Sequence, residues 1–246
     1  DISADHRVLA VDLPGHGFTR LGARLRSGLN AMAADLAALL KAEGFAPDLI
    51  AGHSAGAALA FRLALDGAAP RHGVVAINPA LDDFPGLAGW LFPMMAKMLA
   101  LNPLTAVAFS GLSSGSGARK LIEGTGSRID EAGMAQYRAL IGDRAHVDGA
   151  LQMMSQWSLR RLRREVPRLE VPARFIVAER DATVPPRVGE EAAALIPGAT
   201  VDRWADLGHL AHEEAPGRFA AAIRAATAAS AAPEAAAAPC PAGADP

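Results

Sequence analysis

A short apolar strand, the sequence GHSAG and an apolar helix follow one another within residues 47–65, and this order constrains the fold most. Gly52 and Gly56 lack a Cβ, so the backbone can pass close to its neighbours while Ser54 adopts a strained conformation. We therefore expect Ser54 at the apex of a sharp strand-to-helix turn, the context of a serine nucleophile. The helix would point its first free N–H groups, that of Ala55 among them, toward a developing negative charge.

Strands and helices alternate along most of the chain. Apolar runs predict strands at residues 8–11, 49–51, 74–77, 173–178 and 200–204, and helices at 29–40 and 216–228. This alternation predicts an α/β protein with a mostly parallel sheet that helices cover on both faces. We assign residues 1–80 and 167–229 to this core, and the Ala/Pro-rich residues 230–246 to a disordered tail.

Residues 81–166 interrupt the alternation and predict a helical insert, with helices at 131–141 and 147–157 and a connector at 111–117. Within the insert, residues 87–101 are apolar nearly all round, but the run is shorter than the roughly 20 residues of a membrane span. Both a helix packed on the core and a lid over a pocket fit this pattern. In the lid interpretation, a bulky ligand contacts His53, Trp90, Phe92, Met94, Met95 and Met98.

A serine hydroxyl is a poor nucleophile unless a base accepts its proton and an acid orients that base. The carboxyl ends of parallel strands lie at one edge of a sheet, so the base and the acid should follow later strands. Asp181 follows the strand predicted at 173–178, and His209 follows the strand predicted at 200–204. We expect His209 to serve as general base and then acid, and Asp181 to hold its tautomer.

Other residues compete for these roles. Glu179 lies two residues before Asp181, and Asp82 and Asp83 follow the strand at 74–77, from which an acid can also reach the histidine. His212 lies one helical turn after His209 and could be an ordinary surface histidine. His16 and His53 are expected to make structural hydrogen bonds, with His53 also lining the site.

Composition excludes several other classes of protein. The net charge is −2, which gives no general attraction to nucleic acid or anionic lipid. The only cysteine, Cys240, lies in the tail, so a disulfide framework and a thiolate metal site are both excluded.

A local basic cluster consists of Arg160, Arg161, Arg163 and Arg164. It favours a solvated helix face, with docking to an acidic partner as the alternative. No signal segment opens the chain, so we expect a cytoplasmic protein without metal or cofactor.

The segments RVLAVDLPGHG, AGHSAG, VAERDATVP and LGHLAHEEAP resemble successive signatures of the α/β-hydrolase superfamily, from Arg7 to about Ala228. Within it, GHSAGAALAFRLAL, FPGLAGWLF, ALNPL, GTGSRID and LGHLAHEE resemble the magnesium-chelatase accessory proteins of bacteriochlorophyll synthesis. The resemblance implies an eight-stranded, mostly parallel sheet with a helical cap between strands six and seven. It also implies a part in tetrapyrrole pigment synthesis.

One feature departs from the superfamily pattern. In such proteins three strands precede the DLPGHG strand, and a His-Gly motif after the third supplies a second oxyanion donor. Nothing in this sequence corresponds to them, so we expect an N-terminally truncated fold. The third strand normally lies between the fourth and fifth, and its loss would leave two rows of backbone groups unpaired or force a rearrangement of the sheet.

Two functions remain open at this point. The first is a serine hydrolase acting on an ester or related acyl bond of a hydrophobic substrate, which could be a tetrapyrrole. The second is an accessory protein that binds a porphyrin or magnesium-chelatase subunits without catalysis. The fold alone does not decide between them, because function depends on the site.

Overall fold

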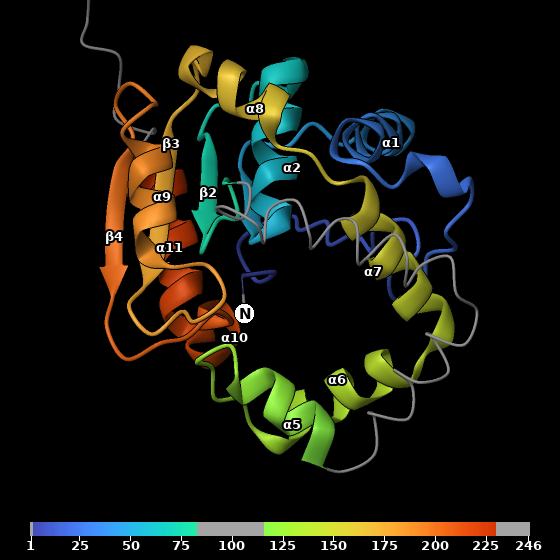
Figure 1. The fold of residues 1–246 in the computed structure, drawn as a ribbon. Coiled ribbons are helices and arrows are strands. Elements are labelled where there is room, and N and C mark those ends of the chain that lie inside the picture. Colours follow the sequence, from blue (N-terminus) through green and yellow to red (C-terminus); the bar gives the residue numbers. More distant parts are fainter. Residues whose placement is uncertain (1, 83–115, 230–246) are drawn as a thin grey trace, which may run out of the picture.

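Four parallel strands form one sheet in the computed structural model, which describes residues 2–82 and 116–229 (Figure 1). The strands are β1 (Ile50–His53), β2 (Val74–Ile77), β3 (Ala173–Ala178) and β4 (Thr200–Trp204), and they pair in the order β1-β2-β3-β4. The register places Ile50 opposite Val74, Val74 opposite Ala173, and Arg174 opposite Thr200. The predicted α/β fold with a parallel sheet is therefore confirmed.

Helices cover both faces of this sheet. The helices outside the insert are α1 (Leu29–Ala42), α2 (Ala55–Leu63), α9 (Pro186–Ala193), α10 (Ala211–Glu214) and α11 (Pro216–Ala229), with short helical turns at Arg24–Arg26, Ala64–Ala68 and Val166–Arg168. Because side chains alternate between the faces of a strand, β2 contributes to two cores. Val74 and Ala76 pack with α1, α2 and α9, whereas Val75 and Ile77 pack with α10 and α11.

The insert is helical where the structure describes it. Its helices are α5 (Ser116–Glu123), α6 (Glu131–Gly142), α7 (Arg144–Gln156) and α8 (Arg160–Glu165). The helix predicted at 131–141 is confirmed by α6, whereas α7 begins three residues earlier and ends one residue earlier than the helix predicted at 147–157. In Figure 1, α5, α6 and α7 form an arc that begins near α10, and the chain returns through α8 next to α2. The connector predicted at 111–117 is wrong at its last two residues, because α5 begins at Ser116 and its regular backbone includes Gly117.

The strand predicted at residues 8–11 is wrong. These residues have no regular structure, and Val8 and Leu9 are 48% and 39% exposed. The described part of the sheet has four strands where the resemblance implies eight, and within it β1 pairs only with β2. An apolar, β-branched run becomes a strand only when a neighbour accepts its hydrogen bonds, and this segment has none in the described sheet.

The loop after this segment packs on the insert instead. The Asp12 carboxylate accepts a hydrogen bond from the backbone N–H of Phe18 at 3.0 Å, which closes the loop. Gly149 of α7 lies so close that a Cβ on it would be 2.0 Å from the carbonyl oxygen of Gly15. The backbone N–H of Gly17 donates to Nδ1 of His146 at 3.2 Å, so the loop and α7 are fixed together.

Several predictions concern residues outside the described ranges: the lid residues Trp90, Phe92, Met94, Met95 and Met98, the alternative acid Asp83, and the tail with Cys240. Within the described ranges, no helix has both the length and the apolar character needed to cross a membrane.

Candidate active site

Ser54 lies in the turn between β1 and α2 with φ 52° and ψ −117°, a backbone conformation that non-glycine residues rarely adopt. The Ser54 N–H donates to the carbonyl of Ile77 at 2.9 Å, which fastens the turn to the end of β2. The Ser54 carbonyl accepts from the N–H groups of Ala57 at 3.1 Å and Ala80 at 3.2 Å. These bonds offset the strain, so the turn is held rigidly at the carboxyl edge of the sheet.

The two glycines of the GHSAG motif differ in how much space surrounds them. A Cβ on Gly52 would lie 2.3 Å from the Gly56 carbonyl oxygen and 2.6 Å from the backbone nitrogen of Ala57. A Cβ on Gly56 would meet no atom of the described residues within 4 Å. Close backbone passage therefore requires glycine at position 52, and the expectation that it also requires glycine at position 56 is wrong for the described contacts.

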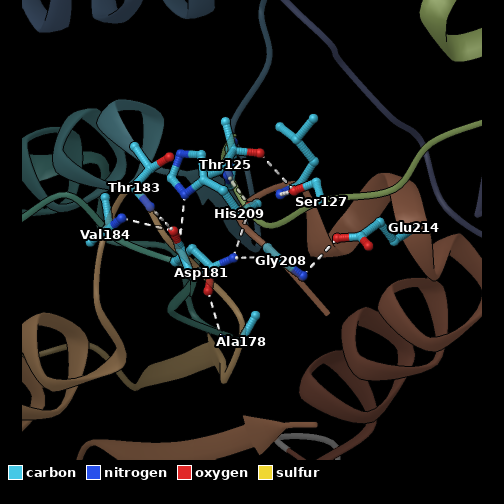
Figure 2. Close-up of polar contacts among 12 residues, drawn as sticks. Thr125, Ser127, Ala178, Asp181, Thr183, Val184, Gly208, His209 and Glu214 are labelled. Carbon is cyan, nitrogen blue, oxygen red and sulfur yellow. Dashed lines mark hydrogen bonds and ion pairs between the residues drawn. The ribbon is translucent and has the colours of Figure 1, made fainter. Parts of the chain in front are cut away.

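Asp181 and His209 contact each other (Figure 2), and both residues are buried. His209 Nδ1 lies 2.7 Å from Asp181 Oδ2. The other carboxylate oxygen, Oδ1, accepts from the backbone N–H groups of Thr183 at 2.8 Å and Val184 at 2.7 Å. An ionised carboxylate only accepts hydrogen bonds, so the proton between the pair is on Nδ1, and Nε2 of the neutral ring is free to accept a proton.

The other candidate acids lie elsewhere. Asp82 forms an ion pair with Arg163, and Glu179 is exposed at the end of β3. Asp181 is thus the acid that contacts His209 in the part of the chain that the structure describes. His212 packs against His53, with ring centroids 4.4 Å apart, and is not a simple surface histidine.

The turn with Ser54 and the loop with His209 are adjacent. His53 Nε2 lies 2.7 Å from the carbonyl oxygen of His209, and the two rings have centroids 4.6 Å apart. Both Ser54 and His209 are within the described ranges, and there no hydrogen bond joins their side chains. The structure therefore brings Asp181 and His209 into contact, and it joins the turn that holds Ser54 to the His209 backbone through His53.

Asn78 is a site residue that sequence analysis missed. Its side chain is buried at the end of β2, where Nδ2 donates to the carbonyls of Gly208 at 3.0 Å and His209 at 2.8 Å. Its Oδ1 accepts from the backbone N–H of Ala178 at 2.8 Å. One amide thus joins the ends of β2 and β3 to the loop that contains His209. The available signal was a polar residue directly after a buried strand at the carboxyl edge of the sheet.

His53 is held in its neutral form. Its burial, together with the nearby His212 and His209, lowers the pKa of His53 from 6.5 to about 3. A carbonyl oxygen can only accept a hydrogen bond, so Nε2 of His53 carries the ring proton and donates a hydrogen bond to the carbonyl of His209. His53 thereby supports the backbone of His209 across the physiological pH range.

We expect the free energy of unfolding to fall as the pH falls from about 6.5. In the unfolded chain His53 binds a proton below its ordinary pKa of 6.5, whereas the folded protein binds it only near 3. The unfolded state then binds more protons, so stability decreases by up to about 1.4 kcal/mol per pH unit for this residue. Urea unfolding at several pH values between 5 and 7 gives the free energy of unfolding as a function of pH. That free energy should change less steeply with pH in His53→Gln than in the wild type. The same pH dependence in both proteins would contradict the neutral buried state of His53.

In the described portion of the chain, no group of three or more His, Cys, Asp or Glu side chains is arranged to hold a metal ion. The residues gathered at this edge of the sheet can instead supply a hydroxyl group, an imidazole with an oriented tautomer, and a buried carboxylate.

The comparisons with known proteins agree with this fold. The pattern of the alpha/beta hydrolase family matches residues 2–222. Over 223 residues the chain is 47% identical to the "Magnesium-chelatase 30 kDa subunit" of Rhodobacter capsulatus, covering 90% of this chain and 78% of that protein.

Two solved structures also resemble this chain. An alpha/beta hydrolase enzyme from a Medee basin deep-sea metagenome library has a TM-score of 0.69 at 18% identity, covering 88% of this chain and 78% of that one. An esterase from Thermogutta terrifontis has a TM-score of 0.66 at 24% identity, covering 89% of this chain and 78% of that one. At these identities the two structures show a shared fold only.

Proposed function

The chain belongs to the alpha/beta hydrolase family, and we propose that it is a serine hydrolase that cleaves an ester or related acyl bond. The observation that supports this most is the buried Asp181–His209 pair, whose 2.7 Å contact leaves Nε2 available beside a strained serine turn. Acyl transfer needs this combination, because the base must be held in one tautomer before it can accept the serine proton.

In the proposed mechanism, His209 Nε2 accepts the hydroxyl proton as Ser54 Oγ attacks the carbonyl carbon of the substrate. The negative charge on the tetrahedral intermediate is stabilised by the backbone N–H of Ala55, the first residue of α2. The Asp181 carboxylate stabilises the imidazolium, which then donates its proton to the leaving group. Water, deprotonated by His209, next attacks the acyl carbon. The bond from that carbon to Ser54 Oγ then breaks, the imidazolium returns its proton to Ser54 Oγ, and the acid is released.

The lack of a direct hydrogen bond between Ser54 and His209 is compatible with this mechanism. Catalytic hydrogen bonds are often long or poorly aligned without substrate and shorten when it binds. Apolar residues 87–101 of the insert favour a hydrophobic substrate, and the lid residues Trp90, Phe92, Met94, Met95 and Met98 would contact it.

A second function has its own support, the 47% identity to the protein named magnesium-chelatase 30 kDa subunit. We propose as the alternative an accessory protein that binds a tetrapyrrole or a chelatase subunit and needs no catalysis. The two functions can share one site, so a single experiment should examine the serine and the tetrapyrrole together.

A fluorophosphonate probe tests the serine directly, because its phosphorus forms a bond to an activated serine oxygen and releases fluoride. We expect the wild-type protein and Ser155→Ala to be labelled, with the label on Ser54, and Ser54→Ala to remain unlabelled. Ser155 is a matched control, since among the described residues its hydroxyl donates to the Gln152 carbonyl within α7. A folded wild-type protein without label would contradict the serine hydrolase.

The same assay with added magnesium-free porphyrin examines the alternative. Slower labelling of Ser54 at increasing porphyrin concentration would indicate that a tetrapyrrole occupies the site. Saturable porphyrin binding by a protein that the probe never labels would favour the accessory function over the hydrolase.

A further inference from the structure

We propose that residues 125–127 of the insert, hereafter the insert loop, position Asp181 and His209 for catalysis. This inference rests on the proposed function and assigns the insert a role at the site besides covering it. The insert loop lies between α5 and α6 and reaches the two loops that hold the pair. These are the acid loop, residues 179–185 after β3, and the histidine loop, residues 205–210 after β4.

The carbonyl of Thr125 joins the acid loop to the histidine loop. It accepts from the backbone N–H of Ala182, the residue after Asp181, at 3.1 Å, and from that of His209 at 3.3 Å. A carbonyl oxygen has two lone pairs, so both bonds can exist at once. One atom of the insert thus fixes the backbone beside both members of the pair.

The hydroxyl of Ser127 fixes the next residue of the histidine loop. Ser127 Oγ accepts from the backbone N–H of Leu210 at 2.8 Å. Ser127 itself is only 1% exposed. Thr125 Oγ1 donates to the carbonyl of Ile122 at 2.6 Å and lies 3.0 Å from Ser127 Oγ. Because the proton of Thr125 is used for Ile122, that of Ser127 can point to Thr125 Oγ1, which orients the Ser127 lone pairs toward Leu210.

Two glycines allow the insert loop to come this close. Gly126 has φ +83°, and a Cβ on it would lie 1.9 Å from the carbonyl oxygen of Arg180. A Cβ on Gly208 would lie 2.3 Å from the carbonyl carbon of Gly126. No side chain fits at either contact, so the insert loop touches the acid loop through Gly126 and the histidine loop through Gly208.

Further contacts extend this junction on the histidine side. Glu214 accepts from the backbone N–H of Gly208 at 2.7 Å through Oε1, and from that of Arg128 at 2.9 Å through Oε2. Leu210 is buried in the small core of the insert, together with Ala118, Ile122 and Met134. Of the two neighbours of His209, Gly208 therefore touches the insert loop at Gly126, and Leu210 is both hydrogen-bonded to Ser127 and packed in the insert. The position of the His209 ring depends on the insert as well as on the sheet.

Ser127→Ala tests this inference, because it leaves the buried N–H of Leu210 without its acceptor. We expect kcat for a p-nitrophenyl ester to fall roughly 10- to 100-fold, the scale on which small misplacements of catalytic groups lower the rate. KM should change little, since Ser127 is a positioning residue. In one-dimensional proton NMR, the His209 Hδ1 resonance should shift or exchange faster with solvent. Ser155→Ala, a loss of one hydroxyl elsewhere in the insert, should match the wild type in every measurement.

An unchanged Hδ1 resonance and kcat in folded Ser127→Ala would overturn the inference. If Ser127→Ala does not fold, Glu214→Gln is measured instead, because glutamine keeps only one of the two acceptor oxygens. A changed Hδ1 resonance and a lower kcat would support the inference, and no change in either would overturn it. The NMR comparison does not require turnover. A wild type that shows the Hδ1 resonance but hydrolyses no ester would refute the proposed hydrolase. In that case, the role of the insert loop would still be decided by whether the resonance changes in the variants.

Discussion

Ser54→Ala should lower kcat/KM for p-nitrophenyl esters by at least about 10³-fold, the scale on which removal of a triad nucleophile acts. Alanine lacks the oxygen that attacks the ester, so the variant cannot form the acyl-enzyme at residue 54. The backbone bonds of residue 54 to Ile77, Ala57 and Ala80 do not involve the hydroxyl and should persist. The thermal unfolding midpoint should therefore remain near that of the wild type.

Ester turnover and circular dichroism of the two proteins check this expectation together. Ser155→Ala again serves as the matched control, with a hydroxyl removed from a site in α7. If a folded Ser54→Ala protein hydrolysed the ester at the wild-type rate, another group would perform the chemistry. The proposal of a serine hydrolase would then have to be abandoned.

Some elements could be predicted closely from the sequence because local signals bound them on both sides. The strand at 74–77 is buried on both faces and ends at Asn78-Pro79, and the strand at 173–178 begins after Pro172. Both agree with the bounds of β2 and β3. The apolar run at 8–11 carries a similar local signal, but a strand also needs a hydrogen-bonding neighbour. No local pattern contains that information.

The candidate site likewise has one part that the sequence predicts and another part that only the folded chain shows. Ser54, Asp181 and His209 are recognisable because a motif or a strand end precedes each of them. The supporting contacts were not predictable, because the groups that meet are far apart in sequence. Asn78 bonds the backbone of His209, and Ser127 bonds the backbone of Leu210. A backbone N–H or carbonyl partner leaves no trace in the residue type, so only the folded chain reveals such pairs.

Asp181→Asn should lower kcat about 10⁴-fold, as does the corresponding change in a well-studied serine protease triad. The physical reason lies in the two carboxylate oxygens. Oδ1 accepts from the N–H groups of Thr183 and Val184, so the asparagine oxygen would take that position and its NH₂ group would face His209. The NH₂ group would donate to Nδ1, which moves the ring proton to Nε2 and leaves no lone pair to accept the proton of Ser54.

Asp82→Asn and Asp83→Asn, made alongside, distinguish this assignment from an acid after β2. Asp82 is paired with Arg163 on the surface, and exposed ion pairs contribute only about 0–1 kcal/mol, so its replacement should leave kcat within a few-fold of the wild type. A small effect of Asp181→Asn combined with a large effect at position 82 or 83 would show that the acid follows β2.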